Sequence, residues 1–199
     1  MTRSELLKTA KPILFNTEMV RAILDGRKTV TRRVALSNKD LHEFHSERYP
    51  HGWWLRGRVY KDWDTLLPSM KRDEFKCRYR TGDILYVRET WRNTNNVYCY
   101  RADTAALEKS FSWEKHHDWR PSIHMPKEAA RIFLRVTDVR VEMLQDCGNA
   151  QAKDEGFTCG SQFARLWNTT IKKSDLARYG WAANPWVWVI EFERLEVQE

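Results

Sequence analysis

The sequence predicts an α+β domain built around a small, mostly antiparallel β-barrel with short flanking helices. Three segments carry this prediction. Residues 130–144 (ARIFLRVTDVRVEML) alternate apolar and polar side chains, residues 82–91 (GDILYVRETW) are an apolar run after a Gly-Asp turn, and residues 184–197 (NPWVWVIEFERLEV) are almost continuously apolar. Alternation is typical of a strand with one buried face, and a continuous run of a strand buried on both faces.

The N-terminal part is expected to contain a strand, a helix and a second strand. Residues 11–15 (KPILF) predict the first strand, and Asn16 or Thr17 suits the N-cap of the helix that follows. This helix has an apolar face and ends at a glycine, at positions Met19, Val20, Ile23, Leu24 and Gly26. Residues 28–34 (KTVTRRV) are expected to be extended, because Thr and Val favour strands.

The C-terminal part supplies further strands and two helices. Residues 96–103 are expected to pair with 82–91, and residues 120–126 (RPSIHMP) to form an extended piece between two prolines. The alternation of 130–144 changes phase at Thr137–Asp138, which predicts a β-bulge. Two helices are expected, one over 149–155 that ends at Gly156 and one over 161–172 that is capped by Ser161 and buries Phe163, Leu166 and Trp167.

Two stretches, one polar and aromatic and one charged and aromatic, interrupt this pattern. Residues 37–80 and 104–119 show no clear periodicity, and Gly and Pro residues punctuate the first stretch. We interpret both as surface insertions in a single domain that spans residues 11–197.

The composition favours an anionic partner. The 199 residues include 34 Lys+Arg and 27 Asp+Glu, which gives a formal net charge of +7. Nucleic acid or a nucleotide is the ligand that such a balance favours first. Aromatic residues make up 13% of the chain. Most are expected in the core, Trp186 and Trp188 among them, although a basic chain rich in Trp also suits base stacking.

Other classes of function are not indicated. The four cysteines form no C-x-x-C pair, so we expect reduced thiols and a cytoplasmic protein. His42, His45 and His51 share one segment (HEFHSERYPH), but no cysteine or acidic cluster completes a ligand set, so no metal or other cofactor is expected. No signal peptide or apolar run of membrane-spanning length is recognised, and no obligate protein partner is indicated.

Several motifs, taken together, resemble one known family. In chain order they are ILDGRKTVTRR (23–33), GDILYVRETW, FLRVTDVRVEML, a short helix ending in AKDEGF (152–157), and WVWVIEFERL; RPSIHMP, ARLWN and ANPWVWVIEFERL belong to the same set. This combination is similar to the ASCH domain of the PUA-like β-barrel superfamily, in the form common in bacteriophages and prophages. The resemblance covers most of residues 11–195 outside the two insertions. It implies a PUA-like barrel with a cleft for RNA or a nucleobase.

The resemblance also implies an activity. Some ASCH proteins are amidohydrolases that act on N(4)-acetylcytidine. Their motif of a Lys, a Thr three residues later and a distant Glu falls on Lys28, Thr31 and Glu155 of this sequence. From the pattern alone, Lys28 and Thr31 could also be the solvated end of a basic strand, and Glu155 an exposed residue near a helix end.

These three residue types suit the hydrolysis of an exocyclic amide. Thr31 offers a hydroxyl nucleophile, a buried Lys28 with a lowered pKa could deprotonate it, and Glu155 could protonate the leaving amine. Residues three apart on a regular strand point to opposite faces. Lys28 must therefore lie in the turn after Gly26, before the strand begins.

Five further residues are candidates for substrate binding. Arg33 offers a planar fork for a carbonyl or phosphate, or else an ion pair with a nearby acid. Glu89 and Trp91 share a strand face and could read a base edge and stack on it; the alternative is a buried Glu–Arg pair and a core Trp. Arg120 and His124 alternate onto one face of 120–126, although a lone His is more often structural.

Three functions are consistent with this cleft, each with a nucleoside or single-stranded RNA as partner. The preferred one is an amidohydrolase that removes acyl groups from the exocyclic nitrogen of N(4)-acylcytidine-like substrates. The first alternative is a single-stranded RNA endoribonuclease, active on polymers and inactive on nucleosides. The second alternative is a non-catalytic module that binds RNA or a modified base, with binding that weakens steeply with salt.

Overall fold

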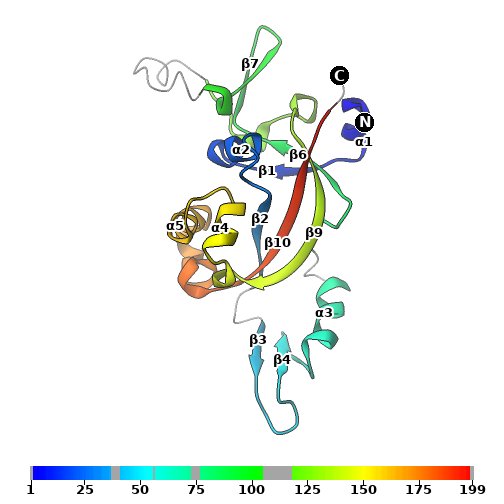
Figure 1. Ribbon diagram of the computed structural model, residues 1–199, viewed down its shortest axis with the longest axis vertical. Helices are drawn as coiled ribbons and strands as arrows, with labels where there is room; N and C mark the ends of the chain where they lie inside the picture. Colours follow the sequence, from blue (N-terminus) through cyan, green and yellow to red (C-terminus); the bar gives the residue numbers. More distant parts are fainter. Residues whose placement is uncertain (1, 37–40, 56, 73–76, 105–117, 198–199) are drawn as a thin grey trace.

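The structure, a computed structural model, describes residues 2–36, 41–55, 57–72, 77–104 and 118–197 (Figure 1). It belongs to the predicted α+β class, and its strands pair mostly antiparallel. The helices and strands follow the chain in this order: α1 (Arg3–Thr9), β1 (Lys11–Leu14), α2 (Thr17–Leu24), β2 (Val30–Leu36), β3 (Leu41–Phe44), β4 (Gly52–Leu55), β5 (Arg58–Tyr60), α3 (Trp63–Arg72), β6 (Ile84–Arg88), β7 (Trp91–Thr94), β8 (Val97–Tyr100), β9 (Phe133–Met143), α4 (Asn149–Asp154), α5 (Gly160–Thr170), α6 (Leu176–Tyr179) and β10 (Trp186–Leu195).

Five strands form the main sheet, in the order β1-β6-β9-β10-β2. β9 and β10 pair antiparallel along their length and are the long curved ribbons at the centre of Figure 1. β1 pairs with β6 in parallel, and the other neighbours are antiparallel. Among the described residues, no ladder joins the edge strands β1 and β2, so the sheet is not closed by backbone pairing.

The phase shift in the sequence of β9 is a β-bulge, as predicted. Asp138 pairs with Glu191 and Val136 pairs with Phe192, so Thr137 is an extra residue on β9. A bulge resets the alternation of side chains. Val136 before it and Val139 after it therefore face the same apolar cluster.

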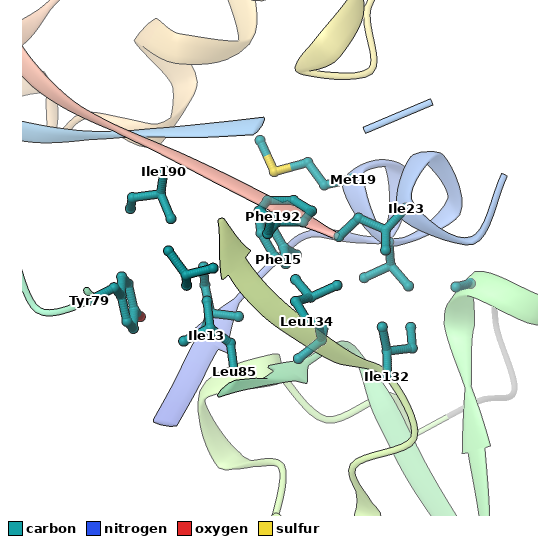
Figure 2. Packing of buried hydrophobic residues seen from close by; sticks show 14 of the residues in the cluster. Ile13, Phe15, Met19, Ile23, Tyr79, Leu85, Ile132, Leu134, Ile190 and Phe192 are labelled. Atoms are coloured by element: carbon teal, nitrogen blue, oxygen red, sulfur yellow. The ribbon is translucent and has the colours of Figure 1, made fainter. Parts of the chain in front are cut away.

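This cluster is the largest part of the core and lies between the main sheet and α2 (Figure 2). Asn16 caps α2 as expected, because its side-chain oxygen accepts a hydrogen bond from the Met19 amide at 2.8 Å. The apolar face of α2 then meets side chains from four strands of the sheet. The labelled members in Figure 2 are Ile13, Phe15, Met19, Ile23, Tyr79, Leu85, Ile132, Leu134, Ile190 and Phe192.

Two helices, α4 and α5, pack on the opposite face of β10. Val187 and Val189 contact a cluster that includes Phe163 and Trp167 of α5. Trp188 and Ile190, the alternate residues of β10, belong to the core on the α2 side. Burial on both faces explains the continuous apolar run of this strand.

The first expected insertion contains elements that its polar sequence did not indicate. β3, β4 and β5 form an antiparallel sheet of their own, and α3 follows it. Trp53 and Trp63 contact Trp186 of β10, with ring centroids 5.3 Å and 5.2 Å away. This tryptophan cluster anchors residues 41–72 to the main sheet. The expected insertions also include residues 37–40, 56, 73–76 and 105–117, which lie outside the described residues.

The expected pairing of 96–103 with 82–91 is mostly wrong. The chain leaves the main sheet after Arg88, and only the end of that segment, Trp91, pairs with β8. β7 and β8 make a separate hairpin, whose turn places Asn95 and Asn96 at positive φ values of 51° and 62°. Asn tolerates this left-handed conformation better than most residues.

Two further local expectations are wrong. Residues 120–126 are not extended, because Ser122–His124 forms a 3₁₀ turn whose carbonyl at Ile123 accepts a hydrogen bond from Arg88. Helix α5 spans nearly the expected range, but its N-cap is Cys159 rather than Ser161, and the Gly160 amide donates to the Asn149 side chain at 2.9 Å.

Helix α1 has no counterpart in the sequence-based expectations. Thr2 and Glu5 form a capping box at its start, and Leu6 is buried in a second apolar cluster with Tyr86 and Phe133. None of the helices in the described part of the chain is long and apolar enough to span a membrane. All four cysteines are free thiols.

The tryptophan cluster predicts unequal effects of two Trp substitutions. Trp186→Ala removes a ring that is 8% exposed and contacts two others. We expect the free energy of unfolding to fall by about 3–5 kcal/mol. Trp54→Ala removes a half-buried ring that stacks on the exposed His42, so its expected cost is about 1 kcal/mol. Urea unfolding followed by circular dichroism measures both, and equal losses would contradict the anchoring role.

Candidate active site

The candidate site is built where the start of β2 meets the end of α4. Lys28 and Glu155 form an isolated antiparallel bridge, and the Thr29 amide donates to the Asp154 carbonyl at 2.8 Å. Lys28 precedes β2, which begins at Val30, so it lies in the turn that follows α2, as the argument from strand geometry requires.

Two glycines give the backbone its close approach at this point. Gly26, after α2, has a φ of +72°, and Gly156, after α4, has a φ of +92°. A Cβ at Gly156 would lie 2.7 Å from the Cβ of Ala22 and 3.4 Å from the Cβ of Lys28. Any larger residue at 156 would therefore push Glu155 away from Lys28.

Lys28 is a buried cation whose three ammonium protons each have an acceptor. Its Nζ lies 2.5 Å from Glu155 Oε2, 2.6 Å from the Val30 carbonyl and 3.2 Å from the Glu155 carbonyl. Its side chain is 0% exposed and that of Glu155 is 1% exposed. Burial lowers the pKa of Lys28 from its ordinary value, and the carboxylate of Glu155 opposes this effect. The solvated basic strand end and the exposed helix residue are thus both excluded.

Arg32, which the sequence analysis did not select, is the second cation on Glu155. Its Nη1 lies 3.3 Å from Glu155 Oε1 and its Nη2 lies 3.5 Å from Glu142 Oε2. The residue is 2% exposed, and its Nε has no hydrogen-bond partner. A signal for its burial was present, because Arg32 alternates with the apolar Val30 and Val34 along β2.

Thr31 and Arg33 lie on the other face of β2. Arg33 Nη1 donates to Thr31 Oγ1 at 3.0 Å, and Arg33 Nη2 donates to the Leu14 carbonyl of β1 at 3.0 Å. The Lys28 Nζ and the Arg33 Cζ lie 5.6 Å and 5.4 Å from the centre of the Phe15 ring. Both cations therefore lie near the ring of Phe15.

The structure therefore brings together four of the predicted residues, Lys28, Thr31, Arg33 and Glu155. Thr31 is fully buried, and no hydrogen bond joins it to Lys28 among the described residues. In this arrangement Lys28 is an ion-pair partner of Glu155 rather than a base in contact with Thr31.

The other predicted residues form a second group, in which Glu89 contacts Arg131 and Arg120 contacts Trp91. Glu89 is 1% exposed and accepts two hydrogen bonds from Arg131, at 2.9 Å and 3.0 Å. Burial raises the pKa of Glu89, and Arg131 opposes this effect. The ring of Trp91 is 5% exposed and packs in the core with Tyr98. This is the alternative of a buried Glu–Arg pair and a core Trp.

Among the described residues, Arg120 joins this group through Trp91, and no side-chain contact joins His124 to it. The Arg120 guanidinium lies 5.2 Å from the centre of the Trp91 ring, and the two backbones form a bridge. His124 is exposed in the 3₁₀ turn, so the predicted shared face of a strand does not exist. Within the described part of the chain, no hydrogen bond, ion pair or ring contact links this group to Lys28 or Glu155.

The buried ion pair predicts a pH-dependent cost of Glu155→Gln. Removing the carboxylate leaves the buried cations Lys28 and Arg32 without the negative charge that pairs with both of them. We therefore expect a loss of about 3–5 kcal/mol of unfolding free energy near neutral pH. The lowered pKa of Lys28 then falls further. Below this pKa, the charged Lys28 destabilises the folded state of the variant. As the pH rises through it, Lys28 loses its proton, so the cost of Glu155→Gln should be smaller at about pH 9–10 than near neutral pH. Urea unfolding at both pH values measures this.

The matched control for this variant is Glu193→Gln. Glu193 is half-exposed and pairs with Arg135 at 3.4 Å. Its replacement is expected to change stability by less than about 1 kcal/mol at either pH. A cost of Glu155→Gln that is equally small, or that does not change with pH, would contradict a charged pair.

The Glu89–Arg131 pair predicts the opposite pH dependence. Arg131→Ala leaves Glu89 without its two donors, at an expected cost of about 1–3 kcal/mol near neutral pH. The raised pKa of Glu89 then rises further, and the carboxyl group gains a proton as pH falls through it. The cost should therefore shrink at about pH 5. Unfolding of Arg135→Ala, which breaks the exposed Arg135–Glu193 pair, serves as the control. A cost of Arg131→Ala that is larger at about pH 5 than near neutral pH would contradict the assignment.

Comparison with known proteins identifies no relative of this chain. No protein-family model matches the sequence, and neither a curated protein nor a solved structure is found to match the chain.

Proposed function

We propose that this chain is an ASCH-type amidohydrolase with a PUA-like fold, which removes acyl groups from the exocyclic nitrogen of N(4)-acylcytidine-like nucleosides. The observation that carries the proposal is the contact between Lys28 and Glu155. Lys28 and Glu155 are 127 residues apart in the sequence, yet Nζ and Oε2 lie 2.5 Å apart. Thr31 and Arg33 lie on β2, which begins two residues after Lys28. The resemblance places the chemistry on Lys28, Thr31 and Glu155, and Arg33 is a substrate-binding candidate beside them.

The contact also suggests how one pair supplies both an acid and a base. If the shared proton moves from Lys28 Nζ to Glu155 Oε2, over the 2.5 Å between them, the pair becomes a neutral amine and a carboxylic acid. Burial lowers the pKa of Lys28 from its ordinary value and so lowers the cost of this transfer, whereas the charged pair is the resting form. No proton is gained or lost by the pair in this step.

The acyl transfer then has a complete proton balance. Thr31 Oγ1 attacks the amide carbonyl, its proton passes to Lys28 once Nζ has moved within hydrogen-bond reach of the hydroxyl, and Glu155 protonates the cytidine N4 as the C–N bond breaks. Arg33, which already donates to Thr31 Oγ1, stabilises the oxyanion. Water then attacks the acyl-threonine, with Glu155 accepting its proton and Lys28 returning one to Thr31. The products are cytidine and the carboxylic acid.

A non-catalytic binding module is the second candidate, and the burial of the site favours it. Lys28, Thr31 and Glu155 are 2%, 0% and 1% exposed, so a substrate reaches them only after the covering residues move. An ion pair that stays closed would support the fold while RNA or a modified base binds elsewhere on this basic chain. This candidate requires binding without turnover.

The test is hydrolysis of N(4)-acetylcytidine, followed by ultraviolet absorbance. Thr31→Val keeps the shape of the side chain and removes the nucleophile, so it is expected to abolish turnover, as is Lys28→Met. Thr29→Val is the matched control, because Thr29 belongs to the same motif but is exposed. It should retain activity. Circular dichroism verifies that each variant is folded. Turnover that survives in Thr31→Val, or no turnover by the native chain, would reject the proposal.

A further inference from the structure

The β3–β4 hairpin places three potential metal ligands on one face. The ladder pairs Phe44 with Gly52, so the next positions outward, His45 and His51, lie opposite each other. Glu43 is two residues before His45 and therefore points to the same side of its strand. It is also the diagonal neighbour of His51, within the reach of a long side chain.

The side-chain atoms are close to the spacing of a coordination sphere. One ligand atom from each of Glu43, His45 and His51 lies within 4.8 Å of the other two. Glu43 Oε1 and His51 Nδ1 are 3.2 Å apart, which is close to the separation of two ligands that are each about 2.1 Å from a zinc ion. All three residues are exposed, so small rotations of their side chains can complete the approach.

A second contact orients one of the imidazoles as a ligand. The Nδ1 of His45 is hydrogen-bonded to the Pro50 carbonyl. A carbonyl can only accept, so Nδ1 carries the proton and Nε2 presents its lone pair. Metal-binding histidines are typically held in this way, by a donated bond from the other ring nitrogen.

The turn that carries Pro50 is itself fixed. Ser46 and Tyr49 exchange two backbone hydrogen bonds, at 3.0 Å and 3.1 Å. Phe44 packs on Tyr49, and a Cβ at Gly52 would lie 2.6 Å from the Phe44 ring. The two histidines therefore flank an ordered turn.

We propose that Glu43, His45 and His51 bind one Zn²⁺ ion. Two imidazoles and one carboxylate suit Zn²⁺ and leave a fourth position for water or for an oxygen of another molecule. The sequence-based expectation of no metal site rested on the lack of a cysteine or an acidic cluster to complete the histidines. The hairpin register brings one carboxylate, that of Glu43, to the two histidines. This site is separate from the residues of the proposed amidohydrolase and does not depend on that function.

The experiment is a calorimetric titration of Zn²⁺ into the full chain, without a histidine tag and after treatment with a chelator. We expect one ion per chain, and at least about tenfold weaker binding in each of His45→Ala, His51→Ala and Glu43→Gln. Glu43→Gln keeps the length of the side chain, so its loss of binding at an unchanged circular dichroism spectrum reports the carboxylate itself.

His42→Ala is the matched control, because His42 lies on the same strand but faces the other side, where it stacks on Trp54 at 4.9 Å. It should bind Zn²⁺ as the native chain does. The proposal is overturned if the native chain binds no Zn²⁺. It is also overturned if the three variants bind as well as the native chain, since the ion would then be held by other groups.

Discussion

Two charged side chains that are 127 positions apart in the sequence, Lys28 and Glu155, meet inside the protein, and the arrangement around β2 depends on their contact. Buried charges are stable only when they are paired and their hydrogen-bonding groups are satisfied. Lys28 meets this condition with one carboxylate and two backbone carbonyls. The pair thereby fixes the end of α4 against the start of β2. Gly26 and Gly156 make the approach possible, because both adopt backbone angles that other residues avoid.

Strand β2, which follows Lys28, places charged side chains on both faces of the sheet. Arg32 faces α5 and holds the second oxygen of Glu155, while Thr31 and Arg33 face the side of Phe15. Arg33 also reaches the carbonyl of Leu14, so a side chain links β2 to β1 where no backbone ladder does. One short segment therefore contains the chemistry of the proposed site and a contact between the two edges of the sheet. Substitutions that conserve shape are needed here to separate a loss of chemistry from a loss of structure.

The elements that the sequence predicted well are those with local, periodic signals. The capped helix after Asn16, the bulge at Thr137 and the doubly buried β10 all follow from alternation or capping within a few residues. Long-range pairs leave no such signal. Glu89 meets Arg131 across 42 residues, and nothing in the pattern around either one identifies the other. Lys28 and Glu155 were selected through the resemblance, whereas Arg32, whose alternation with Val30 and Val34 indicates burial, was not selected. The hairpin of β3 and β4 was not predicted because each strand has only four residues and shows no clear alternation.

We propose that Thr31 attacks the acyl group of the substrate while Lys28 and Glu155 transfer the protons. Mass spectrometry of the protein, quenched with acid during turnover of N(4)-acetylcytidine, tests it most directly. We expect an acetyl group on the peptide that contains Thr31, present during turnover, absent once the substrate is exhausted, and absent in Thr31→Val. Release of cytidine without any acetylated Thr31, or with the acetyl group on another residue, would contradict it.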